Sequence, residues 1–244
     1  MWHVPKENLS LAVDALRDGT FLGLSVTLPH KEAVMGLVDA VDPEARRLGA
    51  VNCLARAEGG RVMGFNTDGV GFVRALDTQG ASLLNARVLV LGAGGAARAA
   101  VGAAVFARAS EVQVANRSLD RARALARDFG ASVHAIASTS EALQRALAQC
   151  EVLVNATSVG LNDAAACPLP EDVCLSATAT VLDMVYRPLR TRLLLRAEAA
   201  GARTVDGLWM LIHQALEQLR LWTGFEGDAL LATRLHAHLC EELP

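Results

Sequence analysis

The chain has 244 residues, of which 52% are hydrophobic, 20% charged and 4% aromatic, and its formal net charge is -3. At about 150 residues per domain this length allows one or two domains, and the high apolar content argues against disorder. The slightly acidic balance provides neither a basic footprint for nucleic acid nor a polybasic membrane anchor. Few aromatic residues are available to stack on bases. Composition therefore disfavours nucleic-acid binding.

Other features of the sequence bear on where the protein works. No apolar run reaches the roughly 18 residues that a membrane span needs. The start, Met1 to Ser10, carries charged residues and a proline where a signal peptide would be apolar. The five cysteines are widely spread and form no C-x-x-C, and His236 and His238 would diverge on a helix, so we predict no metal site. A cytoplasmic protein fits these features best.

The first predicted elements lie before residue 80. Residues 21–28 can form a strand that ends at Pro29, and a short helix is expected over 30–38. Two strand-like segments, 50–57 and 61–65, flank Gly59-Gly60, which indicates a β-hairpin or paired strands.

From residue 87 onward, apolar strands alternate with helices, as in β-α-β units. The predicted strands cover 88–91, 111–115, 152–154 and 181–183, and the predicted helices cover 95–109, 118–129, 141–148, 207–222 and 228–240. Gly130 lies where a helix C-cap would fall. Because continuous apolar strands are typical of a parallel sheet covered on both faces, we expect a doubly wound α/β domain here.

A glycine-rich turn joins the first of these strands to its helix. The run Gly92-Ala93-Gly94-Gly95-Ala96-Ala97 matches G-x-G-x-x-A, the small-residue form of the dinucleotide fingerprint. Gly92 would permit the tight turn, Gly94 would let the backbone approach a pyrophosphate, and Ala97 would let the helix pack closely. The helix N-terminus would then offer free amides to phosphates. A glycine-rich turn that binds nothing is the alternative.

The end of the second strand of this block favours NADP over NAD. An NAD site places an acidic residue there to bind the ribose 2′-hydroxyl, whereas this chain has Asn116-Arg117-Ser118, with Arg121 one turn further on. Two guanidiniums without a carboxylate suit a 2′-phosphate. Arg117 and Arg121 could also be solvated residues at a helix start, but there they oppose the helix dipole, which favours the ligand interpretation.

Several separated motifs can now be read together. In chain order they are Ser25-Val-Thr-Leu-Pro-His-Lys31, Gly49-Ala-Val-Asn52, Asn66-Thr-Asp-Gly69, the glycine turn, Asn116-Arg117-Ser118, Asn155-Ala-Thr-Ser158, Asp183-Met-Val-Tyr186-x-Pro188 and Gly207-Leu-x-Met-Leu211-x-x-Gln214. This series resembles the shikimate dehydrogenase family, NADP-dependent α/β enzymes of aromatic amino-acid biosynthesis, over nearly the whole chain. The resemblance implies hydride transfer that interconverts 3-dehydroshikimate and shikimate, in a monomer or homodimer.

The resemblance also implies a fold and a role for individual residues. A Rossmann-like NADP domain would cover 71–207, and a smaller α/β substrate domain would comprise 1–70 and 208–244, with the cleft between them. Lys31 and Asp68 would form the catalytic pair. The substrate would be held by Thr27, Asn52, Asp68, Tyr186 and Gln214. The NADP site would comprise Gly92, Ala93, Gly94, Gly95, Ala96, Asn116, Arg117, Ser118 and Arg121, with Thr157, Gly207 and Met210 at the nicotinamide.

The chemistry gives an independent reason for a lysine–carboxylate pair. Reduction of a ketone by hydride develops charge on oxygen, so a nearby proton donor lowers the barrier. Lys31 follows Pro29 at a predicted helix start, where the dipole disfavours its positive charge, and Asp68 would hold the ammonium in place.

Each of these residues also has a simpler interpretation. Lys31 could be an ordinary surface lysine, and Asp68 the N-cap of a helix over 69–76. Asn52 could be a turn-capping residue, Tyr186 a packed aromatic, and Gln214 the polar flank of an apolar helix.

The chain departs from the family in two respects. The usual first β-α unit, whose Ser-x-Ser pair binds the substrate carboxylate, has no counterpart, and Ser25 stands where the family has asparagine. We expect either a start codon placed too late or a shortened relative with a truncated substrate domain and an open sheet edge. Two further hypotheses therefore stay open: a family member acting on quinate or another hydroxy acid, and a non-catalytic NADP-binding protein.

Overall fold

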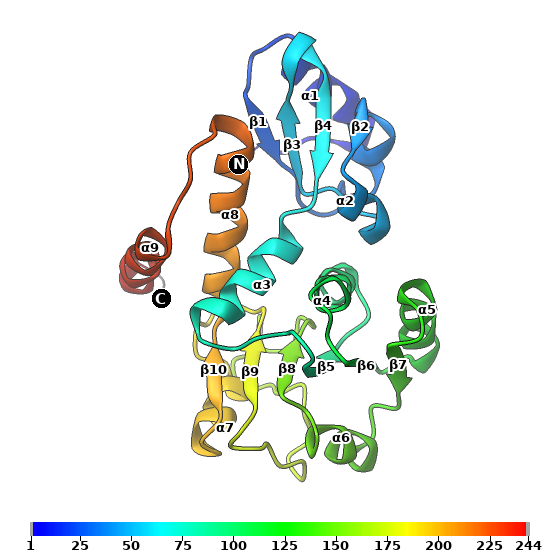
Figure 1. The fold of residues 1–244 in the computed structure, drawn as a ribbon, viewed down its shortest axis with the longest axis vertical. Coiled ribbons are helices and arrows are strands. Elements are labelled where there is room, and N and C mark those ends of the chain that lie inside the picture. Colours follow the sequence, from blue (N-terminus) through cyan, green and yellow to red (C-terminus); the bar gives the residue numbers. More distant parts are fainter. Residues whose placement is uncertain (1, 243–244) are drawn as a thin grey trace. The chain divides into compact units, whose positions relative to one another are not determined.

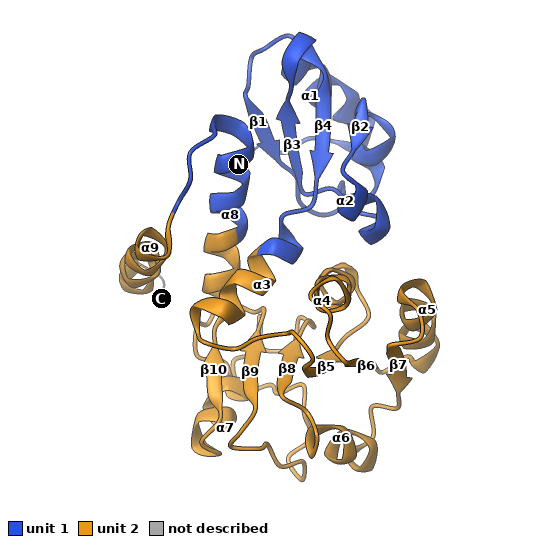
Figure 2. Ribbon diagram, viewed as in Figure 1, with its two compact units in different colours: residues 1–70, 214–227 blue, residues 71–213, 228–244 orange. Residues whose placement is uncertain are grey.

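The computed structural model describes residues 2–242 (Figure 1) and divides into two compact units (Figure 2). Unit 1 comprises Met1–Val70 and Gln214–Gly227, and unit 2 comprises Gly71–His213 and Asp228–Pro244. The units group the C-terminal residues with the larger sheet, whereas the resemblance assigns them to the substrate domain. The domain division implied by the resemblance stays a prediction.

Unit 1 is built around a small mixed sheet. Its elements are η1 Lys6–Asn8, α1 Leu9–Arg17, β1 Gly23–Ser25, η2 Ala33–Gly36, β2 Ala40–Val41, α2 Pro43–Leu48, β3 Cys53–Arg56, η3 Glu58–Gly60 and β4 Val62–Phe65. The strands lie in the order β1-β3-β4-β2, and only β2 and β4 pair in parallel. The hairpin predicted at Gly59-Gly60 is confirmed, since β3 and β4 are antiparallel neighbours on either side of it.

Two features of unit 1 differ from the sequence-based expectation. The helix α1, which was not predicted, buries Leu9, Val13 and Leu16 in a cluster with Val62. The helix predicted over 30–38 is instead the short 3₁₀ turn η2. Only Val34 of that stretch is fully buried, so a longer helix would have no apolar face to cover.

The backbone of β1 lies against a tryptophan of the C-terminal part of unit 1. A Cβ added to Gly23 would lie 1.9 Å from Trp222 Nε1, so the indole occupies the space of the missing side chain. The same nitrogen donates to the carbonyl of Leu54 on β3 at 2.9 Å. Trp222 therefore fixes the position of its own helix on the sheet.

Unit 2 contains a six-stranded sheet. Its elements are β5 Arg87–Leu91, α4 Gly95–Phe106, β6 Glu111–Ala115, α5 Leu119–Phe129, β7 Val133–Ile136, α6 Ser140–Leu147, β8 Val152–Asn155, β9 Thr180–Asp183, α7 Arg192–Ala199, β10 Arg203–Val205 and α9 Ala229–Glu242, while α3 Asp68–Thr78 and α8 Gly207–Thr223 each cross a unit boundary. The strand order is β10-β9-β8-β5-β6-β7, visible from left to right in Figure 1, and every pairing is parallel. The predicted doubly wound parallel sheet is confirmed.

Alternate residues of the central strands serve the two faces of this sheet. Leu89 and Leu91 of β5 belong to one cluster with Leu143 of α6 and Leu193 of α7. Val90 of β5 is also fully buried, although it is not part of that cluster, so the opposite face is covered too. The central strands are thus buried on both faces.

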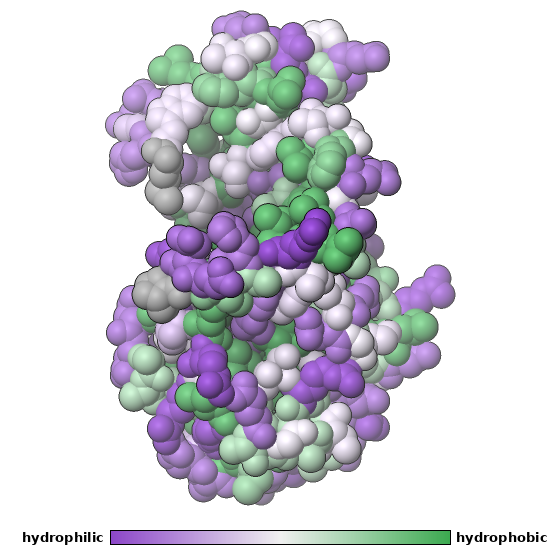
Figure 3. All heavy atoms as spheres, turned by 90° about the vertical axis from the view of Figure 1, so that its left-hand side faces the viewer, coloured by the Kyte–Doolittle hydropathy of each residue, from purple (hydrophilic) through white to green (hydrophobic). Residues whose placement is uncertain are grey.

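Among the described residues, no helix is long and apolar enough to cross a membrane, and no group of three or more His, Cys, Asp or Glu side chains could hold a metal ion. On the face shown in Figure 3, hydrophilic and hydrophobic residues are interspersed.

Candidate functional site

Lys31 and Asp68 form an ion pair within unit 1. Lys31 Nζ donates to Asp68 Oδ2 at 2.6 Å, and the two side chains are 24% and 18% exposed. The helix-dipole argument for Lys31 fails because this residue precedes a 3₁₀ turn of four residues, and the carbonyl of Lys31 accepts from the amide of Val51 at 2.8 Å. A pair that is neither fully buried nor fully solvated can exchange a proton with a bound ligand.

The carboxylate of Asp68 is held from its other side as well. Asn52 Nδ2 donates to Asp68 Oδ1 at 2.8 Å, and Asn66 Oδ1 accepts from the backbone amide of Asp68 at 3.0 Å. Asp68 is the first helical residue of α3, and its side chain accepts from Lys31 and Asn52. Asn66 therefore forms the turn, and both oxygens of Asp68 are oriented by donors.

Asn52 links the start of β3 to the turn before α3. Its side chain is 2% exposed, and Nδ2 also donates to Thr67 Oγ1 at 3.1 Å, while Oδ1 accepts from the amide of Thr67 at 2.7 Å. An amide nitrogen has two hydrogens, and Thr67 and Asp68 accept both of them. Asn52 thus positions Asp68 directly, and the substrate contact that the resemblance implies for it stays a prediction.

The other candidate substrate residues lie in different surroundings. Gln214 Oε1 accepts from Gln218 Nε2 at 2.9 Å, and Gln218, which is 3% exposed, also donates to Thr67 Oγ1 at 3.3 Å. Thr27 is exposed just after β1, and Tyr186 is exposed in unit 2. Gln218 was not among the predicted site residues, although a second glutamine one helical turn after Gln214 was the available signal.

The glycine turn in unit 2 contains one glycine that the backbone conformation requires, Gly92, and one beside open space, Gly94. Gly92 has φ +114°, and a Cβ there would lie 2.9 Å from the carbonyl oxygen of Ala156. Gly94 caps α4 with φ -98°, and a Cβ there would meet no atom within 4 Å. No side chain caps this helix start, so its first amides are available to an anion. The turn fits a dinucleotide pyrophosphate.

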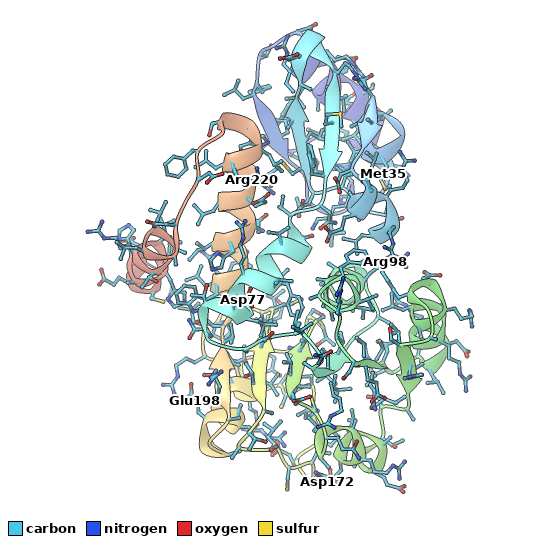
Figure 4. The ribbon with its side chains drawn as sticks, in the orientation of Figure 1. Met35, Asp77, Arg98, Asp172, Glu198 and Arg220 are labelled. Atoms are coloured by element: carbon cyan, nitrogen blue, oxygen red, sulfur yellow. The ribbon has the colours of Figure 1, made fainter. Side chains whose placement is uncertain are left out.

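The candidate 2′-phosphate residues lie beside this turn. Leu91 and Ala115 are register partners at the ends of β5 and β6, so the segment that begins at Asn116 follows the neighbouring strand end. Arg117 and Arg121 are exposed, and within residues 2–242 neither guanidinium makes a hydrogen bond or an ion pair. By contrast, Arg98 of α4, labelled in Figure 4, pairs with Asp128.

The remaining residues of this helix start and of the turn have local roles. Ser118 caps α5 by accepting from the amide of Arg121. Asn116 Nδ2 donates to the carbonyl of Ser118 at 3.0 Å. Ala93 is half-buried, and Gly95 and Ala96 are exposed in the first turn of α4.

The candidate nicotinamide residues lie at the ends of other strands of unit 2. Thr157 follows β8, and Asn155 Oδ1 accepts from its amide at 3.1 Å and from its hydroxyl at 2.7 Å. A Cβ on Gly207 would lie 2.6 Å from the carbonyl oxygen of Met184, so only glycine fits there. Met210 is half-buried in the first turn of α8.

Three segments of the chain match known families. Residues 1–54 match the shikimate dehydrogenase substrate binding domain, residues 75–162 match shikimate / quinate 5-dehydrogenase, and residues 207–230 match the shikimate 5'-dehydrogenase C-terminal domain. The shikimate dehydrogenase (NADP(+)) of Thermococcus kodakarensis is 43% identical over 227 residues, which are 93% of this chain and 80% of that relative. The chain belongs to the shikimate dehydrogenase family.

Solved structures of the shikimate dehydrogenase family share the fold. Shikimate 5-dehydrogenase from Thermus thermophilus, in complex with NADP(H) and shikimate, is 41% identical with a TM-score of 0.86, covering 97% of this chain and 86% of that one. Quinate dehydrogenase from Corynebacterium glutamicum, in complex with NAD, is 33% identical with a TM-score of 0.84, covering 94% of this chain and 82% of that one. These likenesses agree with the Rossmann-like sheet of unit 2.

Proposed function

We propose that the protein is an NADP-dependent shikimate dehydrogenase that interconverts 3-dehydroshikimate and shikimate. The observation that carries the proposal is the 2.6 Å contact between Lys31 and Asp68, two residues from separate family motifs. The names of the relatives support it, since the Thermococcus protein is a shikimate dehydrogenase (NADP(+)) and the Thermus structure holds NADP(H) and shikimate.

The residues of unit 1 would perform the proton transfer. In the direction of ketone reduction, Lys31 holds a proton at Nζ for the oxygen that becomes negatively charged. Asp68 stabilises the ammonium at 2.6 Å, and Asn52 keeps the carboxylate in that orientation. In the direction of alcohol oxidation, the same pair accepts the proton. Thr27, Asn52, Tyr186 and Gln214 are proposed to hold the substrate's polar groups.

The residues of unit 2 would bind the cofactor. NADP supplies or accepts the hydride when bound. The amides at the start of α4, beside the open space at Gly94, suit its pyrophosphate, and Arg117 and Arg121 suit its 2′-phosphate. Thr157, Gly207 and Met210 are proposed to line the nicotinamide end. We further propose a cytoplasmic monomer or homodimer, on the cysteine pattern and the resemblance.

A second substrate deserves a direct comparison. Ser25 replaces the asparagine of the family motif, and the quinate dehydrogenase of Corynebacterium is a relative at 33% identity. Initial rates with shikimate and quinate, each with NADP+ and NAD+, decide between the two. We expect the highest kcat/KM for shikimate with NADP+, and a preference for quinate would contradict the proposal.

The catalytic pair can be tested cleanly because the chain has only two lysines, Lys6 and Lys31. We expect Lys31→Ala to lower kcat by roughly 10²- to 10⁴-fold, the usual contribution of a positioned proton donor. NADP+ binding, measured by calorimetry, should stay within about twofold. The matched control is Lys6→Ala, which removes an exposed lysine and should retain full turnover. Full activity of Lys31→Ala would exclude the mechanism.

A further inference from the structure

Asp183, the last residue of β9, has a buried carboxyl group that lacks a cationic partner. Its exposure is 0%, and in the part of the chain that the structure describes no basic side chain forms an ion pair with it. Burial raises the pKa of this carboxyl group, although three hydrogen-bond donors oppose the shift. Burying such a group is costly, so its hydrogen bonds call for an explanation.

The three donors come from three different segments. Asp183 Oδ1 accepts from Asn155 Nδ2 at 2.8 Å and from the amide of Val185 at 3.0 Å. Asp183 Oδ2 accepts from Thr191 Oγ1 at 2.6 Å, and Thr191 in turn caps α7. The carboxylate therefore ties the end of β8, the loop after β9 and the start of α7 to one point.

The side chain of Asn155 connects the carboxylate of Asp183 to Thr157. Asn155 and Asp183 are register partners at the ends of adjacent parallel strands. Because Asn155 Nδ2 donates to Asp183, the amide oxygen is directed to the other side, where it accepts from both the amide and the hydroxyl of Thr157. Asn155 Nδ2 also donates to the carbonyl of Val159 at 3.3 Å, so without the shorter bond to Asp183 the amide would lose the stronger of the two contacts that select this orientation.

The backbone around Asp183 also defines the position of a second candidate segment. A Cβ on Gly207 would approach the carbonyl oxygens of Asp183 and Met184 to 2.9 Å and 2.6 Å. The start of α8 is therefore packed directly on the end of β9. Asp183 thus lies between the two segments proposed to line the nicotinamide end, 156–157 and 207–210.

We propose that Asp183 is a positioning residue for the nicotinamide end of the cofactor site. It acts through Asn155 on Thr157 and makes no ligand contact of its own, because its side chain is fully buried. The inference rests on the proposed function, which assigns Thr157 and Gly207 to that end of the site.

The test compares a complete cofactor with a fragment that lacks nicotinamide. We measure binding of NADP+ and of adenosine 2′,5′-bisphosphate by calorimetry, with no turnover, for wild type, Asp183→Ala and Asn155→Ala. Each variant should weaken NADP+ binding roughly 5- to 30-fold, the effect of losing one or two oriented hydrogen bonds. Both should leave the affinity for the bisphosphate within about twofold, since that ligand has no nicotinamide. The double variant should bind NADP+ with the same affinity as the single variant that binds it less tightly, because both substitutions act through the same hydrogen bonds.

The matched control is Thr180→Val, which changes a buried polar residue at the opposite end of the same strand, β9. It should leave the affinities for both ligands unchanged, whatever its effect on thermal stability. If Asp183→Ala fails to fold, Asn155→Ala decides the question alone.

Three results would overturn the inference. They are unchanged NADP+ affinity in the variants, equal weakening of both ligands, and a wild type that binds neither ligand, which would also contradict the proposed cofactor. If both variants weaken NADP+ binding selectively but the wild type does not oxidise shikimate, the result would contradict the proposed activity and support the positioning role.

Discussion

A buried histidine makes the stability of this protein depend on pH. His213 is 6% exposed on α8, and its Nε2 lies 2.9 Å from Thr78 Oγ1. Burial, together with the nearby charge of Arg74, lowers the pKa of His213 to about 4. In the unfolded chain a histidine has a pKa of about 6.5. The folded protein therefore contains the neutral ring at pH values where the unfolded chain binds a proton.

The sign of the pH effect follows from this difference. Below about pH 6.5 the unfolded state takes up a proton that the folded state resists, so the free energy of unfolding falls until about pH 4. The full loss is about 3 kcal/mol for a shift of this size. Urea unfolding of His213→Gln, which cannot titrate, should show a shallower dependence between pH 7 and pH 4 than wild type. The exposed control His238→Gln should keep the wild-type slope, and an unchanged slope in His213→Gln would refute the assignment.

The turn between β5 and α4 contains one glycine that the fold requires, Gly92, and one that the proposed cofactor binding requires, Gly94. Gly92→Ala places a Cβ at positive φ and 2.9 Å from a backbone oxygen, so the free energy of unfolding should fall by about 2–4 kcal/mol. Gly94→Ala has an ordinary φ and meets no atom, so stability should change by under about 1 kcal/mol.

Cofactor binding should be affected directly by Gly94→Ala, the variant that leaves stability nearly unchanged. The Cβ of Gly94→Ala would occupy the open space beside the helix amides, and NADP+ binding should weaken at least about tenfold. Denaturant unfolding and calorimetry on both variants test the pair. Equal NADP+ affinity of Gly94→Ala and wild type would contradict the proposed phosphate position.

The elements that the sequence predicts well are those with a long apolar or periodic pattern. The strand at Glu111–Ala115 and the helix that begins after Ser118 are confirmed because apolar residues at strand spacing and an N-cap leave clear patterns. The strands β7 and β10 were missed because they are short and carry exposed His134 and Arg203 at the two edges of the sheet. Their strand conformation depends on pairing with a neighbour, which local sequence does not reveal.

The candidate site shows a similar division. The motif residues Lys31 and Asp68 were singled out from sequence, and the structure brings their charged groups together. The roles of Gln218 and Asp183 were not foreseen, because they depend on which buried groups meet across neighbouring elements. To predict such hydrogen bonds one must know the three-dimensional positions of the side chains, which the spacing of residues in the sequence does not give.

At the scale of the whole molecule, the candidate residues divide between the two units. Lys31, Asp68 and Gln214 belong to unit 1, whereas the glycine turn and the two arginines belong to unit 2. If the proposed function holds, changes at the glycine turn or at the two arginines should alter the constants of the cofactor only.

The paired variant Arg117→Ala with Arg121→Ala tests this separation. Loss of two guanidiniums should raise the KM for NADP+ roughly 10- to 100-fold while leaving that for NAD+ and for shikimate within about threefold. Steady-state kinetics with both cofactors measure the shift. The control pair is Arg123→Ala with Arg145→Ala, two exposed arginines of unit 2 that already pair with carboxylates. An equal rise for both cofactors would contradict the 2′-phosphate assignment.

The contact between Gly23 and Trp222 links two sites almost two hundred positions apart in the gene. The indole fills the volume that any larger residue at 23 would need, and it also forms the hydrogen bond to Leu54. A larger residue at 23 would displace an edge strand or the end of α8, and a smaller residue at 222 would leave a cavity and lose the hydrogen bond to Leu54. During divergence these two positions are therefore constrained to change in concert, a bulkier residue at one requiring a smaller one at the other.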